Sequence, residues 1–312
     1  MAGSYAQIED DEKKKDGEED KEEGNEKEGN EKEGEESENG SEIELTEQEK
    51  TQAEEHARPN ALVVHEVIRK EGEEELGRPA ISLFWSALAA GLSMGFSLVA
   101  EGLLRTYLPD APWRPLVANL GYTVGFIIVI MGRQQLFTEN TLTPVLPLLN
   151  KPEWKTLGQL LRLWAIVLVS NLVGALAFAW VVSHAGVFEA GVRDNFAALG
   201  REAMQGDFWA HLVRGVFAGW LIALVVWLLP SAENSRFQII LTLTYLVGLG
   251  GLAHVIAGSV EVLYLVTTDA ASWGSYFGVF LAPALLGNIL GGVTLVAALN
   301  FGQVVSGKGE GK

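Results

Sequence analysis

Cysteine is absent from the 312 residues of this chain. The chain therefore has no disulfide framework, no thiol nucleophile and no thiolate metal site. Its other polar residues show no Ser/His dyad, metal-ligand cluster or pair of carboxylates at a useful spacing, so we expect no enzyme, no metal site and no cofactor. Acidic rather than basic residues follow Met1, which argues against a secretory signal peptide.

Positive charge is scarce at the start of the chain. Residues 1–60 hold 23 of the 40 acidic side chains and 8 of the 23 basic ones, a net charge of −15 out of −17 for the whole chain. The same segment contains the run "GNEKEGNEKEG" and few residues that could build a core. We therefore predict that residues 1–58 form a disordered, acidic, cytoplasmic tail. Its acidity argues against nucleic acid as a partner.

A short helix is predicted between this tail and the first long apolar segment. Residues 59–78 include "NALVVHEVIRKEGEEEL", in which Asn60 can cap a helix and Val64, Val67 and Ile68 share one face. This pattern indicates an amphipathic helix on the cytoplasmic membrane surface, although a solvated connector helix would have the same pattern.

Long apolar segments dominate the rest of the chain. They cover roughly residues 81–104, 116–149, 157–183, 208–230, 237–268 and 274–300. We expect an all-α integral membrane protein with six transmembrane helices in a pore domain over residues 79–303, followed by a short C-terminal tail over 304–312. Six crossings leave both termini on one side. The flanking lysines and arginines favour the cytoplasm for that side.

Two of these segments, the second and the fifth, are interrupted by polar or glycine-rich sequence. The interruptions are "GRQQLFTENT" at 132–141 and "GLGGLAHVIAG" at 248–258. A hydrocarbon core about 30 Å thick needs about 20 helical residues, so neither apolar half of the second segment is a comfortable span by itself. The interruptions therefore lie at membrane depth, where irregular backbone must face a pore or other protein.

An internal repeat relates the two interruptions. "SNLVGALAFAW" in the third segment resembles "GNILGGVTLVAAL" in the sixth, so that Asn171 and Gly174 correspond to Asn288 and Gly291, 117 residues apart. The same offset takes Phe137 to His254. Three spans per repeat is an odd number, so we expect two inverted three-helix repeats. Their broken helices would then meet near the midplane with half-helix N-termini facing each other.

The interrupted segments resemble motifs of the formate/nitrite transporter family. "QLFTENT" is similar to the family's Leu-Phe-Thr-containing loop, "LAHVIAGSVEVLY" to its Glu-His-Ser-x-Ala-Asn-Met segment, and "LLGNILGG" to its Gly-Asn-Ile-(Ile/Leu)-Gly-Gly. The resemblance covers residues 81 to about 303 and is strongest to a bacterial inner-membrane branch of the family. It implies an aquaporin-like fold, a homopentamer, and one anion pore through each protomer in the bacterial inner membrane.

Four residues would carry the pore function by this resemblance. Leu136, Phe137 and Thr138 match the loop in which apolar side chains narrow the pore and the threonine hydroxyl faces the permeant. His254 matches the family's central histidine. A lone histidine in an apolar segment is otherwise more often a satisfied core residue.

Two positions depart from the family pattern. Ala253 stands where the glutamate before the central histidine is usual, and Ala203 stands where a lysine is expected before the fourth span. Arg201 lies nearby and could replace that lysine, although arginine and lysine are not equivalent. Both departures bear on which anion is carried.

Other polar residues are predicted to support the site. We expect Asn171 and Asn288 to tie down the broken backbone by hydrogen bonds, and Arg133 and Glu139 to form a mutual or intersubunit ion pair that fixes the loop. Glu261 could line a vestibule or pair with a neighbour. The remaining histidines are expected at the surface or at interfaces; they are His56, His65, His184 and His211.

These patterns favour a channel or proton-coupled transporter for small monovalent anions. Half-helix N-termini would attract the anion. A histidine, which titrates near neutral pH, could let a weak acid cross the constriction in neutral form. A neutral-solute pore of the aquaporin type is an alternative, although no Asn-Pro-Ala turn occurs in the chain. A non-transporting membrane scaffold that uses its acidic tail is a second alternative.

Overall fold

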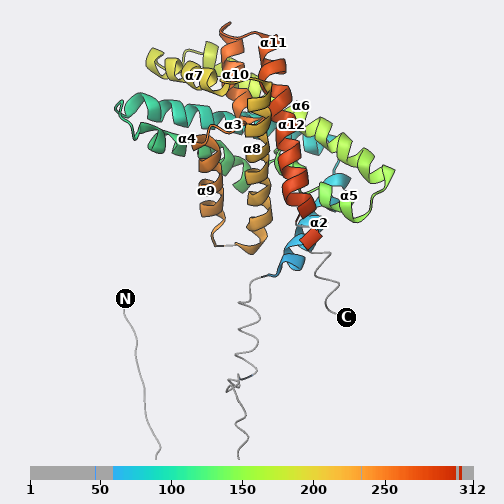
Figure 1. The fold of residues 1–312 in the computed structure, drawn as a ribbon. Coiled ribbons are helices and arrows are strands. Elements are labelled where there is room, and N and C mark those ends of the chain that lie inside the picture. Colours follow the sequence, from blue (N-terminus) through green and yellow to red (C-terminus); the bar gives the residue numbers. More distant parts are fainter. Residues whose placement is uncertain (1–45, 47–58, 233, 300–301, 304–312) are drawn as a thin grey trace, which may run out of the picture. The chain divides into compact units, whose positions relative to one another are not determined.

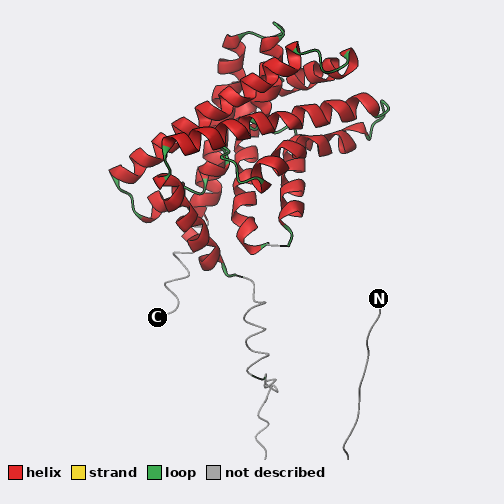
Figure 2. Cartoon of the chain, turned by 180° about the vertical axis from the view of Figure 1, so that it is seen from behind, coloured by secondary structure: helices red, strands yellow, loops and turns green. Residues whose placement is uncertain are grey.

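The computed structural model describes residues 46, 59–232, 234–299, 302 and 303. The tail predicted over residues 1–58 lies almost entirely outside these residues, as does the one predicted over 304–312. All regular structure in the described part is helical, as Figures 1 and 2 show. In chain order the helical elements are α2 (Ala61–Gly77), α3 (Ala80–Tyr107), α4 (Arg114–Met131), η1 (Glu139–Thr141), α5 (Val145–Asn150), α6 (Trp154–His184), α7 (Ala190–Ala203), α8 (Phe208–Leu228), η2 (Leu229–Ser231), α9 (Arg236–Leu249), α10 (Ala257–Thr267), α11 (Trp273–Ser275), η3 (Tyr276–Leu281), α12 (Ala282–Leu290) and η4 (Gly291–Ala298).

Five helical segments of the described part are long and apolar enough to cross a membrane. They are α3, α4, α6, the segment α8–η2 and the segment from α11 to η4. The second expected span ends as a helix at Met131 and resumes only as the short α5, and the fifth is divided into the shorter apolar helices α9 and α10. Both broken segments thus lie where the sequence predicts them. A sixth crossing requires α9 and α10 to act in series, and this count stays a prediction.

Helix α2 begins with the cap expected from the sequence. The Asn60 side chain accepts a hydrogen bond from the backbone N–H of Val63 at 3.0 Å. On the exposed face, the Arg69 guanidinium donates to Glu66 and Glu73. The hydrogen bond from Arg69 lowers the pKa of Glu66 to about 2, so this carboxylate is charged at every pH near neutrality.

Helix α7 was not predicted from the sequence. It lies between the third and fourth spans, in "AGVRDNFAALGREA". Its buried face consists of Val192, Phe196, Leu199 and Gly200, and the first three of these have the spacing of a helix. The helix packs on α10 and α3. At Gly200 an added Cβ would meet the carbonyl oxygen of Glu261. The fold therefore places α7 directly against α10, the helix that follows the second break.

Glycines allow two helix pairs to cross closely, one pair in each repeat. In the first repeat, a Cβ at Gly91 of α3 would overlap the backbone of Asn171 on α6, and one at Gly174 would overlap the backbone of α3. In the second, Gly219 of α8 meets the backbone of Asn288 and Gly291 meets the backbone of α8. Small residues let helix backbones approach in a membrane. The two repeats thus share one crossing geometry.

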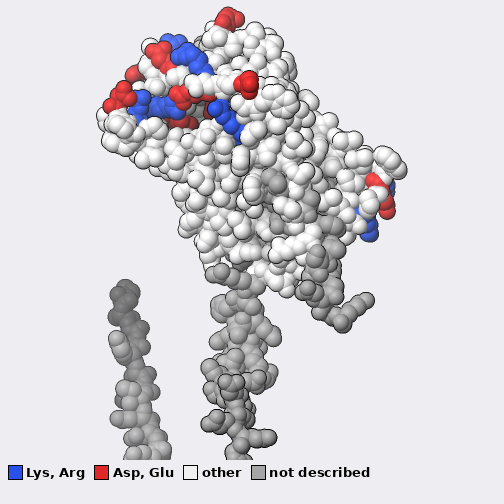
Figure 3. All heavy atoms as spheres, in the orientation of Figure 1, with Lys and Arg blue, Asp and Glu red and all other residues white. Residues whose placement is uncertain are grey.

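Charged side chains are confined to the ends of the pore domain in the face that Figure 3 displays. They gather at the end that carries α7 and near the start of α6, while the body between them has no charged atoms in this view. The outward side chains of the long helices include many large apolar ones, among them Trp85, Phe96 and Trp180. An apolar surface of this kind is suited to contact with lipid or with a neighbouring subunit.

Candidate pore

The helices before the two breaks end in the same backbone motif. At the end of α4, the N–H of Gln134 donates to the carbonyl of Val129, and at the end of α9 the N–H of Leu252 donates to that of Val247, both at 3.0 Å. A left-handed residue precedes each donor, Arg133 with φ 49° and Gly251 with φ 57°. This is the Schellman ending of a helix. The two endings are 118 residues apart.

Asn171 of α6 holds the first break. Its side-chain oxygen accepts from the backbone N–H of Phe137 at 2.9 Å. Its Nδ2 donates to the carbonyls of Gln135 at 2.9 Å and Ala87 at 2.7 Å. One buried amide therefore satisfies irregular backbone that cannot reach water and ties the break to α3.

Asn288 of α12 does the same at the second break. It accepts from the N–H of Val255 at 2.8 Å and donates to the carbonyls of Ala253 at 2.8 Å and Gly215 at 2.9 Å. The backbone partner of Phe137 is therefore Val255, and the repeat offset within the breaks is 118 rather than 117. This corrects the predicted equivalence of Phe137 and His254. By backbone position, His254 corresponds to Leu136.

The two breaks lead into different structures. After the second break, α10 begins at Ala257 and runs for 11 residues. After the first, the chain makes the three-residue η1 and then the six-residue α5. The expectation of two facing half-helix N-termini is thus wrong, because only α10 is long enough to carry an appreciable dipole. The segment after the first break has a further side-chain hydrogen bond, from Trp164 Nε1 to the carbonyl of Asn140 at 2.9 Å.

The four predicted pore residues are all buried. Leu136, Phe137, Thr138 and His254 are each at most 1% exposed. Thr138 Oγ1 and His254 Nε2 are 2.7 Å apart, so the two breaks meet in a hydrogen bond. The His254 ring also packs edge-on against Phe126, with ring centroids 4.8 Å apart.

The hydrogen bonds of His254 define its tautomer. The backbone N–H of Ala257 donates to Nδ1 at 3.1 Å, so Nδ1 carries no proton in this arrangement. The neutral imidazole then has its proton on Nε2 and donates it to the Thr138 hydroxyl oxygen. The hydroxyl hydrogen of Thr138 is left to bond a further acceptor.

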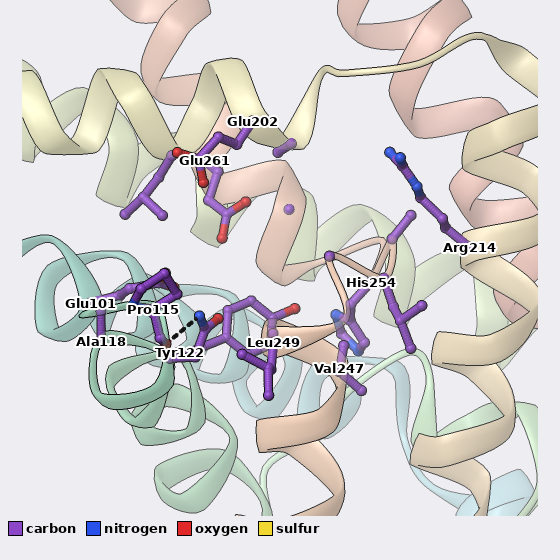
Figure 4. A pocket seen from close by; sticks show the side chains of 18 of the residues that line it. Glu101, Pro115, Ala118, Tyr122, Glu202, Arg214, Val247, Leu249, His254 and Glu261 are labelled. Atoms are coloured by element: carbon purple, nitrogen blue, oxygen red, sulfur yellow. Dashed lines mark hydrogen bonds between the residues drawn. The ribbon is translucent and has the colours of Figure 1, made fainter. Parts of the chain in front are cut away.

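A cavity of about 350 Å³, here called cavity 1, borders His254 (Figure 4). It is lined by the first part of α4, the start of α8, the end of α9 and the second break, and it reaches His254. In Figure 4, Glu202 and Glu261 project from one side and Arg214 from another.

The carboxylates of cavity 1 differ in whether they form an ion pair. Arg105 pairs with the buried Glu101 at 2.9 Å and with Glu202 at 2.7 Å. No ion pair of the described residues includes Glu261, which is 8% exposed and borders the cavity together with His254. The structure thus places Glu261 at the wall of cavity 1, and its role in a pore vestibule stays a prediction.

A second cavity of about 450 Å³, cavity 2, lies at the other ends of the same helices. Whereas cavity 1 takes residues from the starts of α4 and α8, cavity 2 takes residues from their ends, together with the first break and α2. Glutamates of α2 face it, and burial raises the pKa of one of them, Glu71, while Arg133 across the cavity opposes this shift.

Arg133 and Glu139 both border cavity 2. No ion pair joins them among the described residues, and Glu139 Oε1 has no hydrogen-bond partner there. The expected mutual pair is therefore not formed. Arg133 lies in the left-handed turn that ends α4, whereas Glu139 lies in η1, beyond the irregular part of the break. A pair between subunits stays a prediction.

His211 lies in cavity 1, although we expected it at a surface or interface. It is 1% exposed and its two ring nitrogens each contact a backbone carbonyl oxygen. Its position in the first turn of α8, after the Asp207 cap, was the one available signal in the sequence. Arg201, the suggested replacement for the family lysine, is exposed and does not line cavity 1, whereas Ala203 does.

Residues 62–302 match the model of the formate/nitrite transporter family. The chain belongs to this family. It is 42% identical over 269 residues to the inner membrane protein YfdC of Escherichia coli (strain K12). The aligned region covers 84% of this chain and 87% of that protein.

Solved structures of the formate/nitrite transporter family share the fold. A pentameric formate channel with formate bound has a TM-score of 0.63 at 22% identity and covers 72% of this chain and 98% of that one. An ion channel of the same family has a TM-score of 0.69 at 18% identity, covering 77% and 98%. The expected aquaporin-like, all-helical membrane fold is confirmed.

Proposed function

We propose that each protomer passes a small monovalent anion of the formate or nitrite type between cavity 1 and cavity 2. The observation that carries this proposal is the hydrogen bond between Thr138 and His254, which joins the two breaks between two cavities at opposite ends of α4. The family membership supports transport of this class.

The proposed constriction consists of Leu136, Phe137, Thr138 and His254. It suits a weak acid that crosses in neutral form. A bare anion between Leu136 and Phe137 would lose its hydration at a cost of several kcal/mol. The Thr138 hydroxyl can donate to the anion, since its oxygen accepts from His254. Of the four predicted pore residues, only His254 has an ionisable side chain. It can take a proton from cavity 1 on Nδ1, releasing Ala257, and pass its Nε2 proton through the Thr138 hydroxyl to the anion.

We further propose that the protein is a homopentamer of the bacterial inner membrane with both termini in the cytoplasm. One family structure is described as pentameric, and the YfdC relative is an inner membrane protein. The apolar side chains that project from α3 and α6 would then meet lipid or a neighbouring subunit. Under this orientation α2 and cavity 2 face the cytoplasm.

A flux panel in proteoliposomes tests the function. We expect uptake of at least one of formate, nitrite, acetate, lactate and hydrosulfide. Chloride, which is not the anion of a weak acid, should pass more slowly. Glycerol and urea serve as neutral controls. Passage of the neutral solutes alone would replace this proposal by a pore of the aquaporin type, and passage of none of these solutes would favour a scaffold.

A further inference from the structure

His211 differs from His254 in the partners of its ring. Its Nδ1 lies 2.9 Å from the carbonyl oxygen of Asp207, and its Nε2 lies 2.9 Å from that of Ala203. A carbonyl oxygen only accepts hydrogen bonds, so each contact requires a proton on the ring nitrogen. A neutral imidazole has one such proton. The imidazolium has both.

The surroundings of one carbonyl also favour a cation. Ala203 is the last residue of α7, a helix of 14 residues, and its carbonyl lies at the negative end of the helix dipole. A positive group at this end is stabilised. The edge of the His211 ring packs against Phe280, at 5.8 Å between centroids, which fixes the ring between its two acceptors.

We infer that His211 holds both ring protons near neutral pH and supplies a fixed positive charge to cavity 1, which attracts the anion toward His254. This inference rests on the proposed transport function. It assigns opposite states to the two imidazoles of one cavity, His254 neutral and His211 charged, because one accepts a backbone N–H and the other does not.

Other charged groups around cavity 1 determine how strongly the charge of His211 attracts an anion. The Asp207 carboxylate caps the same helix turn and favours the imidazolium, whereas the N-terminus of α8 opposes it. The remaining charged groups that line cavity 1 are Glu101, Arg105, Arg114, Glu202, Arg214 and Glu261. These are three carboxylates and three guanidinium groups, and Arg105 pairs with two of the carboxylates, Glu101 and Glu202. His211 therefore shifts the balance of the cavity toward attraction of anions.

The charge is tested spectroscopically in the full chain. Solid-state NMR of ¹⁵N-histidine protein in bilayers at pH 7 should show one buried histidine with two protonated ring nitrogens, and this signal should disappear in His211→Gln. His184→Gln, which changes an exposed histidine, is the matched control and should leave the signal in place. A single protonated nitrogen on His211 at pH 7 would overturn the inference.

The effect on transport is measured with formate. We expect His211→Gln to reduce the initial formate flux at pH 7 about tenfold. His211→Lys should keep the flux and should make it less dependent on pH above 7, because an ammonium replaces the imidazolium. Wild-type flux from His211→Gln protein of equal oligomer size would contradict the inference. If the wild type carries no anion, the proposed function fails while the spectrum still decides the charge of His211.

Discussion

Arg133 and Gly251 occupy equivalent positions 118 residues apart, and both have left-handed backbone conformations. Glycine adopts this conformation without a steric penalty, whereas other residues carry a cost of about 1–2 kcal/mol. Arginine at the first of these positions therefore carries a cost that its counterpart avoids. Its side chain borders cavity 2, which gives the residue a role beyond ending α4.

The first prediction concerns this pair. Gly251→Ala should lower the free energy of unfolding by about 1 kcal/mol through backbone strain alone, since no atom lies within 4 Å of the added Cβ. Gly278→Ala is the control, because its Cβ is equally free and its φ is not positive. Thermal unfolding in detergent compares the two. Equal melting temperatures would show that the turn at Gly251 tolerates a side chain.

The second prediction concerns the asparagines that hold the breaks. Asn171→Ala and Asn288→Ala should each cost at least about 2 kcal/mol of stability, because each leaves one N–H and one carbonyl of the irregular backbone without a partner. Asn195→Ala is the control, because it removes an amide that makes two hydrogen bonds at the more exposed side of α7. The fraction of protein that stays assembled after heating is the measurement. Similar losses for all three variants would refute the special role of the two break asparagines.

The third prediction concerns the helix crossings. Gly91→Ala and Gly219→Ala should each destabilise the pore domain by about 1–3 kcal/mol, because the added Cβ overlaps backbone, which cannot move aside like a flexible side chain. Gly158→Ala on α6 adds the same group in open space. Size-exclusion profiles and melting temperatures should separate the first two from the third. Unchanged profiles for Gly91→Ala would mean that α3 and α6 cross less closely than described.

The fourth prediction is that His254 controls proton-linked flux without affecting assembly. His254→Asn keeps a polar side chain of comparable size, but an amide does not titrate near neutral pH. Flux of a weak acid should therefore fall and lose part of its dependence on pH between about 5 and 8. The carboxylate of Glu66 stays charged throughout this range and cannot produce the effect. Identical pH profiles from equally assembled proteins would leave His254 with a packing role alone.

The fifth prediction is that the protein forms a homopentamer whose stability does not require the acidic tail. A segment poor in apolar residues cannot bury enough surface to hold subunits together. Native mass spectrometry should give the same pentamer for the full chain and for a chain shortened to residues 59–312. Monomers from the shortened chain would contradict this.

The positions of the two breaks could be predicted from the sequence better than the side-chain contacts around them. Apolar length located both breaks, and the Asn-x-x-Gly repeat pointed to the two asparagines whose amides hold them. The register within the breaks was wrong by one residue, because the connection from Val255 to Asn288 is one residue shorter than that from Phe137 to Asn171. A comparison of short motifs does not show that one of the two connections between the motifs is a residue longer than the other.

His211 shows why some contacts escape prediction. Its state depends on two carbonyl oxygens, one of them at the end of a helix that the apolar pattern did not reveal. The sequence does not show which backbone carbonyl oxygens will accept a hydrogen bond from a side chain.

The equivalence of Leu136 and His254 gives the channel a direction. Two inverted repeats alone would make a passage that looks the same from either membrane face, with no built-in sense of inward and outward. At its centre, however, one repeat carries the imidazole of His254 and the other the inert isobutyl group of Leu136. His254 borders cavity 1, whereas Leu136 borders neither cavity. Under the proposed function, a permeant that enters from cavity 1 therefore meets an acid–base group at once, and one that enters from cavity 2 does not.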